Sequence, residues 1–253
     1  MPELHRLDKG VYGVTNLTMP FPGIGVNAGF ITTSNKIINI DSGLTINDGT
    51  YLLNTARNKA NHQKETQLIL THHHSDHIFG MRVFREAGAK VLAHKSLHRF
   101  LSHRQLPFFR TFYATYKPFI IKMMTKRQLC SREKAESILG DVKLSPPDEM
   151  FNEDTAIKLN DDNLSLFYTP GHVLSEISVY HPESRTLFAG DTIYQGMPLT
   201  TKFGRHKEWR QWIESLEKLE RLDIKNIVPG HGKICEKDEI RRNITYLEDI
   251  LSR

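Results

Sequence analysis

One short stretch of the sequence concentrates side chains that bind metal ions. Its four candidate ligands are His72, His74, Asp76 and His77. They follow the apolar run Leu68–Leu70, which predicts a buried strand, so they stand where that strand leaves its sheet. On a backbone that is still extended, His72 and His74 point to one side and His73 points to the other. Imidazole nitrogen and carboxylate oxygen together suit zinc, iron or manganese, so the stretch predicts a metal site.

Three further candidate ligands share one setting, directly after an apolar run and beside a glycine. They are His172, Asp191 and His231. Glycine permits a sharp turn, so the side chain that follows it can point back toward the strand end. Each signal alone is also typical of a structural turn. Together they put five histidines and two aspartates at four predicted strand ends, and we expect one shared site. Asp41 also follows a predicted strand, where a simple turn residue is the alternative.

This pattern resembles the metallo-β-lactamase-fold hydrolase superfamily, and the resemblance covers nearly the whole chain. It implies an αβ/βα sandwich with two metal ions at one edge. The implied ligands of the first ion are His72, His74 and His172, and those of the second are Asp76, His77 and His231. Asp191 would bridge both ions together with a hydroxide. Asp41 matches an outer carboxylate that orients a ligating imidazole, whereas His73 matches no ligand.

Two divalent ions about 3.5–4 Å apart lower the pKa of a shared water and polarise a carbonyl or phosphoryl oxygen. Hydrolysis is therefore the expected reaction. Asp191 stands where true β-lactamases of the superfamily carry cysteine, so antibiotic hydrolysis is disfavoured. The resemblance is closer to the branch of hydroxyacylglutathione hydrolases and lactonases. Only about twenty residues follow Gly232, too few for the C-terminal helical domain of the glutathione thioester hydrolases.

Tyr194 lies three residues after Asp191, the spacing at which lactonases of the superfamily carry a tyrosine. Its hydroxyl could donate to a substrate carbonyl, and a tyrosine packed beside the strand is the alternative. We expect a metal-dependent hydrolase that acts on an ester, a lactone or a thioester. A metal-dependent phosphodiesterase or nuclease is an alternative, and a persulfide dioxygenase-like enzyme with one iron ion is another. The expected cofactors are two divalent ions, Zn²⁺ first and iron or manganese otherwise.

The elements that must position these residues alternate between strands and helices. Apolar and β-branched runs predict strands at 10–14, 26–33, 36–40, 67–71, 90–94, 156–159, 164–168, 176–180, 186–190 and 226–229. Amphipathic repeats predict helices at 51–64, 79–85, 207–221 and 237–251. The fold class is α/β, and the absence of a linker predicts a single domain over 1–253. No glycine-rich phosphate loop is present, which disfavours a nucleotide-binding fold.

A helical insertion is predicted over about 96–140. Its apolar residues recur at steps of three and four, and Pro118 predicts a kink or a break. These residues are Phe109, Phe112, Tyr113, Tyr116, Phe119, Ile120 and Met123. The segment from Lys95 to Lys134 contains ten Lys or Arg residues and one acid, Glu133, in a chain whose net charge is +5. A lid over the metals, a homodimer interface and a membrane-surface contact all remain open.

The start of the sequence contains acidic residues and lacks the apolar stretch of a secretion signal. No later run reaches transmembrane length, so we expect a cytoplasmic protein without a transmembrane segment. Cys130 and Cys235 are too few for a disulfide framework and are expected to be free thiols. The expected partner is a small-molecule substrate, acyl or anionic, rather than a nucleic acid.

Overall fold

The structure is a computed structural model that describes residues 1–19, 25–60, 65–127, 129–140, 142–159 and 162–253. In these residues, twelve strands form one hydrogen-bonded sheet with two halves. The first half contains β1 (Glu3–Asp8), β2 (Val11–Leu17), β3 (Val26–Thr32), β4 (Lys36–Ile40), β5 (Glu65–Leu70), β6 (Lys90–His94) and β7 (Glu149–Phe151). The second half contains β8 (Thr155–Leu159), β9 (Asp162–Tyr168), β10 (Ile177–His181), β11 (Thr186–Tyr194) and β12 (Asn226–His231). The halves meet where β3 pairs with β12.

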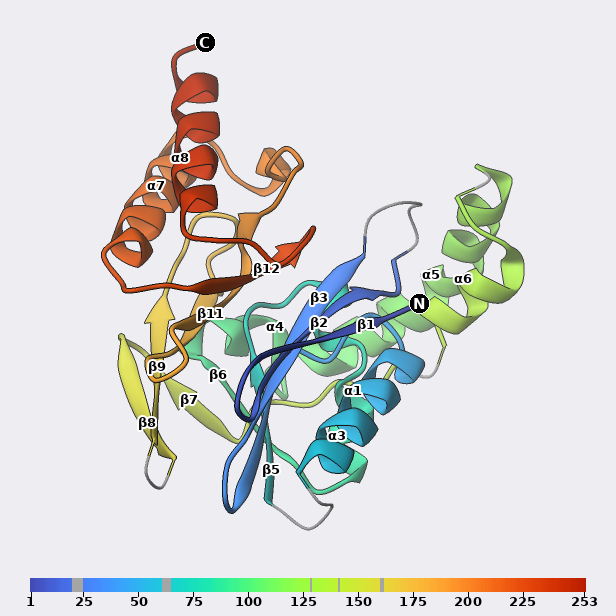
Figure 1. Ribbon diagram of the computed structural model, residues 1–253. Coiled ribbons are helices and arrows are strands. Elements are labelled where there is room, and N and C mark those ends of the chain that lie inside the picture. Colours follow the sequence, from blue (N-terminus) through green and yellow to red (C-terminus); the bar gives the residue numbers. More distant parts are fainter. Residues whose placement is uncertain (20–24, 61–64, 128, 141, 160–161) are drawn as a thin grey trace.

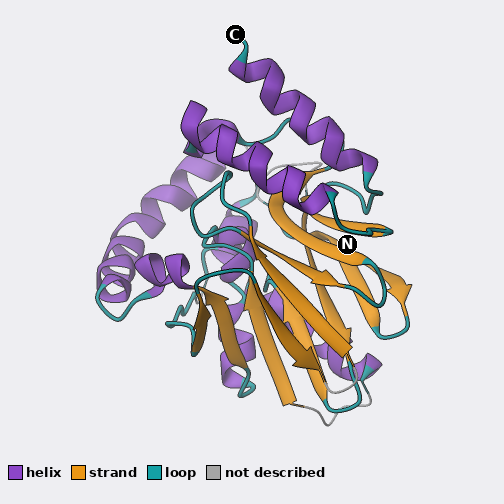
Figure 2. Cartoon of the chain, turned by 90° about the vertical axis from the view of Figure 1, so that its left-hand side faces the viewer, coloured by secondary structure: helices purple, strands orange, loops and turns teal. Residues whose placement is uncertain are grey.

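Helices cover the outer faces of both halves. The first half carries α1 (Ile46–Lys59), α2 (Ser75–Ile78) and α3 (Met81–Glu86), and the second carries α7 (His206–Glu220) and α8 (Asp238–Leu251). In Figure 1, α1 and α3 lie at the lower right and α7 and α8 at the upper left, with the strands between them. Figure 2 shows the strands as one packed group with helices outside it. This arrangement confirms the predicted αβ/βα sandwich.

The sandwich follows from strands that are apolar on both faces. Ile37 and Leu68 pack into the core beneath α1 and α3, whereas Ile38 and Ile69 pack into the core between the two halves of the sheet. In the second half, Leu187 packs beneath α7 and α8 and Phe188 packs into the same inner core. Successive residues of a strand point to opposite faces, so a continuous apolar run needs a covering layer on each side.

Parallel pairing explains why the predicted strand ends come together. β4 and β5 are parallel, and so are β11 and β12. Residues that follow β4 and β5 therefore lie at the same edge of the sheet, which puts Asp41 beside the stretch that begins at Thr71. In the second half, Tyr194 of β11 is paired with His231 of β12. The seam between β3 and β12 joins these two edges.

Several element boundaries differ from the sequence prediction. β1 and β7 were not predicted, and α1 begins at Ile46 instead of Tyr51. The helix begins early because Thr45 and Asp48 form a capping box, in which the Thr45 hydroxyl accepts from the Asp48 backbone N–H. A capping box satisfies backbone donors that would otherwise be free at the start of a helix.

The segment predicted as an insertion is helical, with η1 (Lys95–Leu97), α4 (His98–Leu101), α5 (Gln105–Lys126) and α6 (Arg132–Ile138). Of the predicted kink or break at Pro118, the break is wrong, because α5 continues through it. Proline removes one N–H bond to the residue four positions earlier, and that residue, Ala114, is exposed, so water can satisfy its carbonyl. In the described part of the chain, none of the helices combines the length and apolarity that crossing a membrane requires.

Candidate metal centre

The four residues of the first stretch are oriented by a change of backbone conformation. β5 ends at Leu70, the chain bends at His73, and His74 is extended, with φ and ψ of −68° and 148°. The short helix α2 then begins at Ser75 and carries Asp76 and His77. Two ligands before the helix and two on its turn can therefore converge from one loop.

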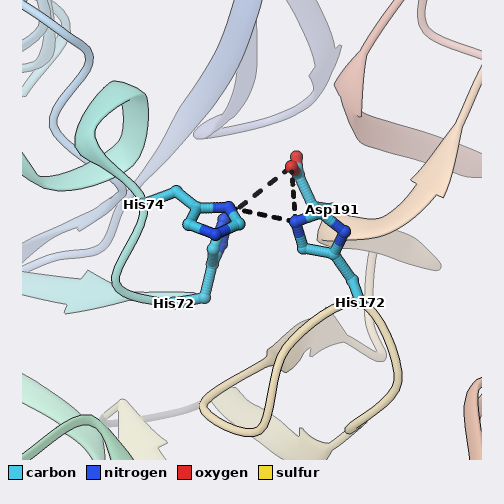
Figure 3. A group of neighbouring side chains, drawn as sticks. All are labelled: His72, His74, His172 and Asp191. Atoms are coloured by element: carbon cyan, nitrogen blue, oxygen red, sulfur yellow. Dashed lines mark hydrogen bonds and ion pairs between the residues drawn. The ribbon is translucent and has the colours of Figure 1, made fainter. Parts of the chain in front are cut away.

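The structure brings all seven predicted ligands together in two groups. The first group consists of His72, His74, His172 and Asp191, and the second group consists of Asp76, His77 and His231. In each group the potential ligand atoms all lie within 4.8 Å of one another. Figure 3 shows His74 and His172 reaching toward the Asp191 carboxylate from different loops. His74 Nδ1 and His172 Nε2 are 3.0 Å apart.

The Asp191 carboxylate lies between the two groups. Its Oδ2 atom is 3.2 Å from His172 Nε2 and 3.8 Å from His72 Nε2, on the side of the first group. Its Oδ1 atom is 3.2 Å from His77 Nε2 and 3.4 Å from His231 Nε2, on the side of the second. A Cβ at Gly230 would come within 2.0 Å of Oδ1, so glycine is needed for this approach.

Buried polar atoms test whether these residues fit metal ions. Among the described residues, His72 Nε2, His77 Nε2 and Asp191 Oδ1 are buried and have no hydrogen-bond partner. Burial of a polar atom without a partner costs free energy, and a cation bound between such atoms would remove that cost. Five imidazoles and two carboxylates are also a donor set that divalent transition metals bind. The residues therefore fit divalent cations.

The pKa values differ between the groups. Burial lowers the pKa of His72 well below its usual range, and burial lowers the pKa values of His74 and His172 to about 4. Burial also opposes charge on His77 and His231, but the nearby carboxylates outweigh it. They raise the pKa of His77 well above its usual range and that of His231 to about 10. At neutral pH the imidazoles of the first group are neutral, so their lone pairs are available to a cation.

A hydrogen bond to Asp41 fixes the ring of His77. Asp41 Oδ2 is 2.7 Å from His77 Nδ1 and also accepts from the Thr71 hydroxyl, while Oδ1 accepts from the Thr71 backbone N–H. Asp41 adopts a positive φ of 64°, which is rare for a residue with a side chain. Because Nδ1 is engaged, Nε2 of His77 is the atom that faces the group. His231 has a similar contact, with Nδ1 3.0 Å from the Gly25 carbonyl.

Sequence reasoning missed Glu176, a buried carboxyl beside the first group. Its Oε1 atom accepts from the Asp191 backbone N–H at 3.0 Å, and its Oε2 atom is 3.4 Å from His72 Nδ1. Burial raises its pKa well above the usual range, and Asp191 adds to the effect. The available signal was an acid directly before the apolar strand β10, where burial on both faces leaves an acid no access to water.

Tyr194 and His73 differ in their position relative to the groups. The Tyr194 hydroxyl is buried and donates to Asp191 Oδ2 at 2.7 Å. Burial raises its pKa well above the usual range. His73 points away, with Nδ1 2.7 Å from the Ser175 hydroxyl and its ring stacked on Phe100 at 3.6 Å between centroids. It belongs to neither group.

The family model of the metallo-beta-lactamase superfamily matches residues 22–231. The chain belongs to this superfamily. Together with the cluster of histidines and aspartates, membership supports a metal-dependent hydrolase. No curated protein matches the sequence.

Solved structures of metallo-β-lactamases are similar to the chain over nearly its whole length. A metallo-beta-lactamase from Pontibacter korlensis is 18% identical with a TM-score of 0.72, and the alignment covers 98% of this chain and 100% of that one. The DIM-1 metallo-beta-lactamase exposed to ceftazidime is 16% identical with a TM-score of 0.71, covering 98% and 97%. A metallo-beta-lactamase from Hirschia baltica is 18% identical with a TM-score of 0.70, covering 97% of each. At these identities the likeness shows the shared fold alone.

In this member of the superfamily, a cavity of about 490 Å³ opens beside both groups. The insertion contributes to its wall through Met124 of α5, Ile138 of α6 and the adjacent Leu139. Phe119 of the insertion is 64% exposed and does not line the cavity, so it is not part of a lid over the two groups in this structure. The side chains of Phe109, Phe112, Tyr113 and Tyr116 lie outside the described residues.

Proposed function

We propose that this protein is a two-metal hydrolase of esters, lactones or thioesters, related to the lactonase and hydroxyacylglutathione hydrolase branch. The observation that carries the proposal is the Asp191 carboxylate, which has one oxygen toward each group of histidines. A carboxylate that serves two cations at once is typical of dinuclear hydrolytic sites. A centre for one cation would leave one of the two groups without a role.

The first group would hold one ion and the second group the other, with Asp191 shared between them. Zinc is the proposed metal, because imidazole nitrogen predominates in both groups. Two such ions, when bound, lower the pKa of a water between them and polarise the carbonyl oxygen of a substrate. Asp41 and Glu176 would hold the imidazole rings in the orientation that this requires.

The chain's own residues would contribute to the reaction through Tyr194. Its hydroxyl lines the cavity and carries a proton across the physiological pH range, because burial raises its pKa. In the structure this proton is donated to Asp191 Oδ2. A substrate carbonyl within reach of the Tyr194 hydroxyl would accept this hydrogen bond in place of Asp191, and the donor would then stabilise negative charge that develops on that oxygen.

The described lining of the cavity supports a carboxylic ester over a phosphodiester. Outside the two groups its one charged residue is Lys202. The basic residues Lys122, Lys126 and Arg132 of the insertion line a different hollow. A nuclease needs cations along the path of the phosphate backbone, and the described lining of this cavity offers Lys202 alone outside the two groups.

Elemental analysis combined with a substrate panel tests the proposal. We expect about two divalent ions per chain, and hydrolysis of lactone, thioester or aryl ester substrates that is lost after chelation. One iron per chain with oxygen uptake would instead support the persulfide dioxygenase-like alternative. Cleavage of RNA or DNA with a steep dependence on salt would support the nuclease.

A further inference from the structure

We propose that the substrate carries an apolar substituent of several carbons that lies in the cavity beside the metal centre, and that Leu139 helps to set its length. This inference rests on the proposed function, since it names the substrate class of the same site. The substituent is an unbranched apolar chain, on either the acyl side or the alcohol side of the bond that is hydrolysed. Two series of esters distinguish an acyl chain from an alcohol chain.

The lining of the cavity is the first observation. Its apolar members are Met19, Leu44, Phe79, Met124, Ile138, Leu139, Met197, Pro198 and Phe203. Among the described lining residues, the carboxylates are Asp76 and Asp191, both assigned to the metal groups, and Lys202 is exposed. A small charged substrate would leave this apolar surface in contact with water, whereas an apolar chain would cover it.

The wall that the insertion contributes is packed in place. Met124, Ile138 and Leu139 are 4–8% exposed and belong to the hydrophobic core that also contains residues of α1 and α3. The backbone N–H of Leu139 donates to the Ala135 carbonyl at 3.0 Å, which caps the C-terminal end of α6. A side chain that is anchored in a core can limit the length of a ligand, because it cannot move aside without a loss of packing.

The segment after β11 contributes Met197, Pro198 and Phe203 to the lining. Phe203, in the 3-10 helix η2 (Thr201–Phe203), is 50% exposed, and its ring centroid is 4.5 Å from that of His74. A large exposed aromatic ring in contact with a candidate ligand is the kind of surface that substrate binding would cover. The insertion and this segment therefore offer apolar surface that continues to the metal groups.

The experiment uses the metal-loaded full chain and two series of esters. One series varies the acyl chain from two to ten carbons with a constant aryl leaving group, and the other varies the alcohol from two to ten carbons on acetate. Each buried methylene should raise kcat/KM roughly fourfold until the cavity is full. A rise in the acyl series assigns the cavity to the acyl chain, and a rise in the alcohol series assigns it to the leaving group.

Leu139→Ala removes part of the wall, and Leu106→Ala is its matched control. Leu106 belongs to the insertion and is buried in the same core, but it does not line the cavity. We expect Leu139→Ala to lower kcat/KM about tenfold for the longest well-hydrolysed ester and to shift the optimum to longer chains, with a much smaller loss for the two-carbon ester. Leu106→Ala should leave the profile unchanged. A circular dichroism spectrum and the metal content establish that each variant is folded.

Binding of decanoate and butyrate, measured by calorimetry, gives a readout that does not depend on turnover. Decanoate should bind the unsubstituted protein at least tenfold tighter than butyrate, and Leu139→Ala should reduce that ratio. Flat profiles in both ester series with active short esters would overturn the inference and leave the proposed function standing. Absence of all ester, lactone and thioester hydrolysis would refute the proposed function. Equal affinities for decanoate and butyrate would then refute the inference as well.

Discussion

Asp191 is the residue on which the centre depends most directly. Its two oxygens face different groups, its backbone N–H donates to Glu176, and Tyr194 donates to its Oδ2 atom. We predict that Asp191→Ala lowers the metal content toward one ion or none per chain and abolishes hydrolysis. His73→Ala is the control, because His73 belongs to neither group. Elemental analysis of both variants checks this, and equal losses would mean that the wrong face of the loop was assigned.

Glu176 and Asp41 lead to a second prediction, because each carboxylate lies beside an imidazole of a different group. Glu176 Oε2 is 3.4 Å from His72 Nδ1, and Asp41 Oδ2 is 2.7 Å from His77 Nδ1. Loss of such outer contacts typically reduces metal affinity about 10–100-fold. We therefore expect Glu176→Gln to weaken the ion of the first group and Asp41→Asn that of the second.

Competition with a chelator on zinc-loaded protein measures the two affinities. Glu239→Gln is the control, because Glu239 is a buried acid on α8 that contacts neither group. The metal-free Glu176→Gln variant should unfold no earlier than the unsubstituted protein, because burial already favours the neutral form of Glu176. Unchanged zinc affinity in Glu176→Gln would rule out its role as a positioning residue.

At the scale of elements, the start of α1 supports the loop that contains Asp41. Thr45 and Asp48 form the capping box, and Asp48 also accepts hydrogen bonds from the backbone and the hydroxyl of Thr18. We predict that Thr45→Ala lowers the free energy of unfolding by about 1 kcal/mol. Thr45→Ser should lose much less, because the cap hydroxyl remains. Urea unfolding of the metal-free proteins measures both, and equal losses would show that the methyl group matters more than the cap.

The sequence predicted the elements best where an apolar run is bounded by glycine or polar residues. β4 and β6 were predicted with their observed bounds, whereas β1 and β7 lie at the outer positions of the sheet and carry few buried residues. A strand with little buried surface has no apolar run to reveal it. The break at Pro118 was predicted from the free energy lost when proline removes a helical hydrogen bond. The rest of α5 outweighs that loss.

At the scale of the whole molecule, metal ions should contribute to stability, since the groups combine residues from both halves of the sheet. A ligand present at a hundred times its dissociation constant stabilises a fold by about 2.7 kcal/mol. We predict that chelation lowers the melting temperature by about 5–10 °C and that zinc or manganese restores it. Differential scanning calorimetry tests this. An unchanged melting curve after verified removal of metal would contradict the assignment of the ligands.

The candidate site was more accessible to sequence reasoning than its surroundings. Histidine and aspartate beside glycine at strand ends are recognisable one motif at a time, and parallel pairing then brings them together. Glu176 was missed because the acid before β10 was its one signal, and the fold alone brings its carboxylate to the backbone N–H of Asp191. The same holds for the cavity wall at Leu139.

We propose that residues 1–253 form one domain, as the continuous sheet supports.

The seam between β3 and β12 has a consequence for the order of folding. Within the described residues these strands share a single pair of partners, Val26 and His231, while each half has an outer core of its own. The ligands from His72 to His231 span about 160 residues, and closing so long a loop is slow. We predict that each half collapses before the other docks, and that both metal sites form in the docking step, because each group combines residues from both halves. Zinc added during refolding should leave the rate of the early phase unchanged. It should stabilise the docked product of the late phase.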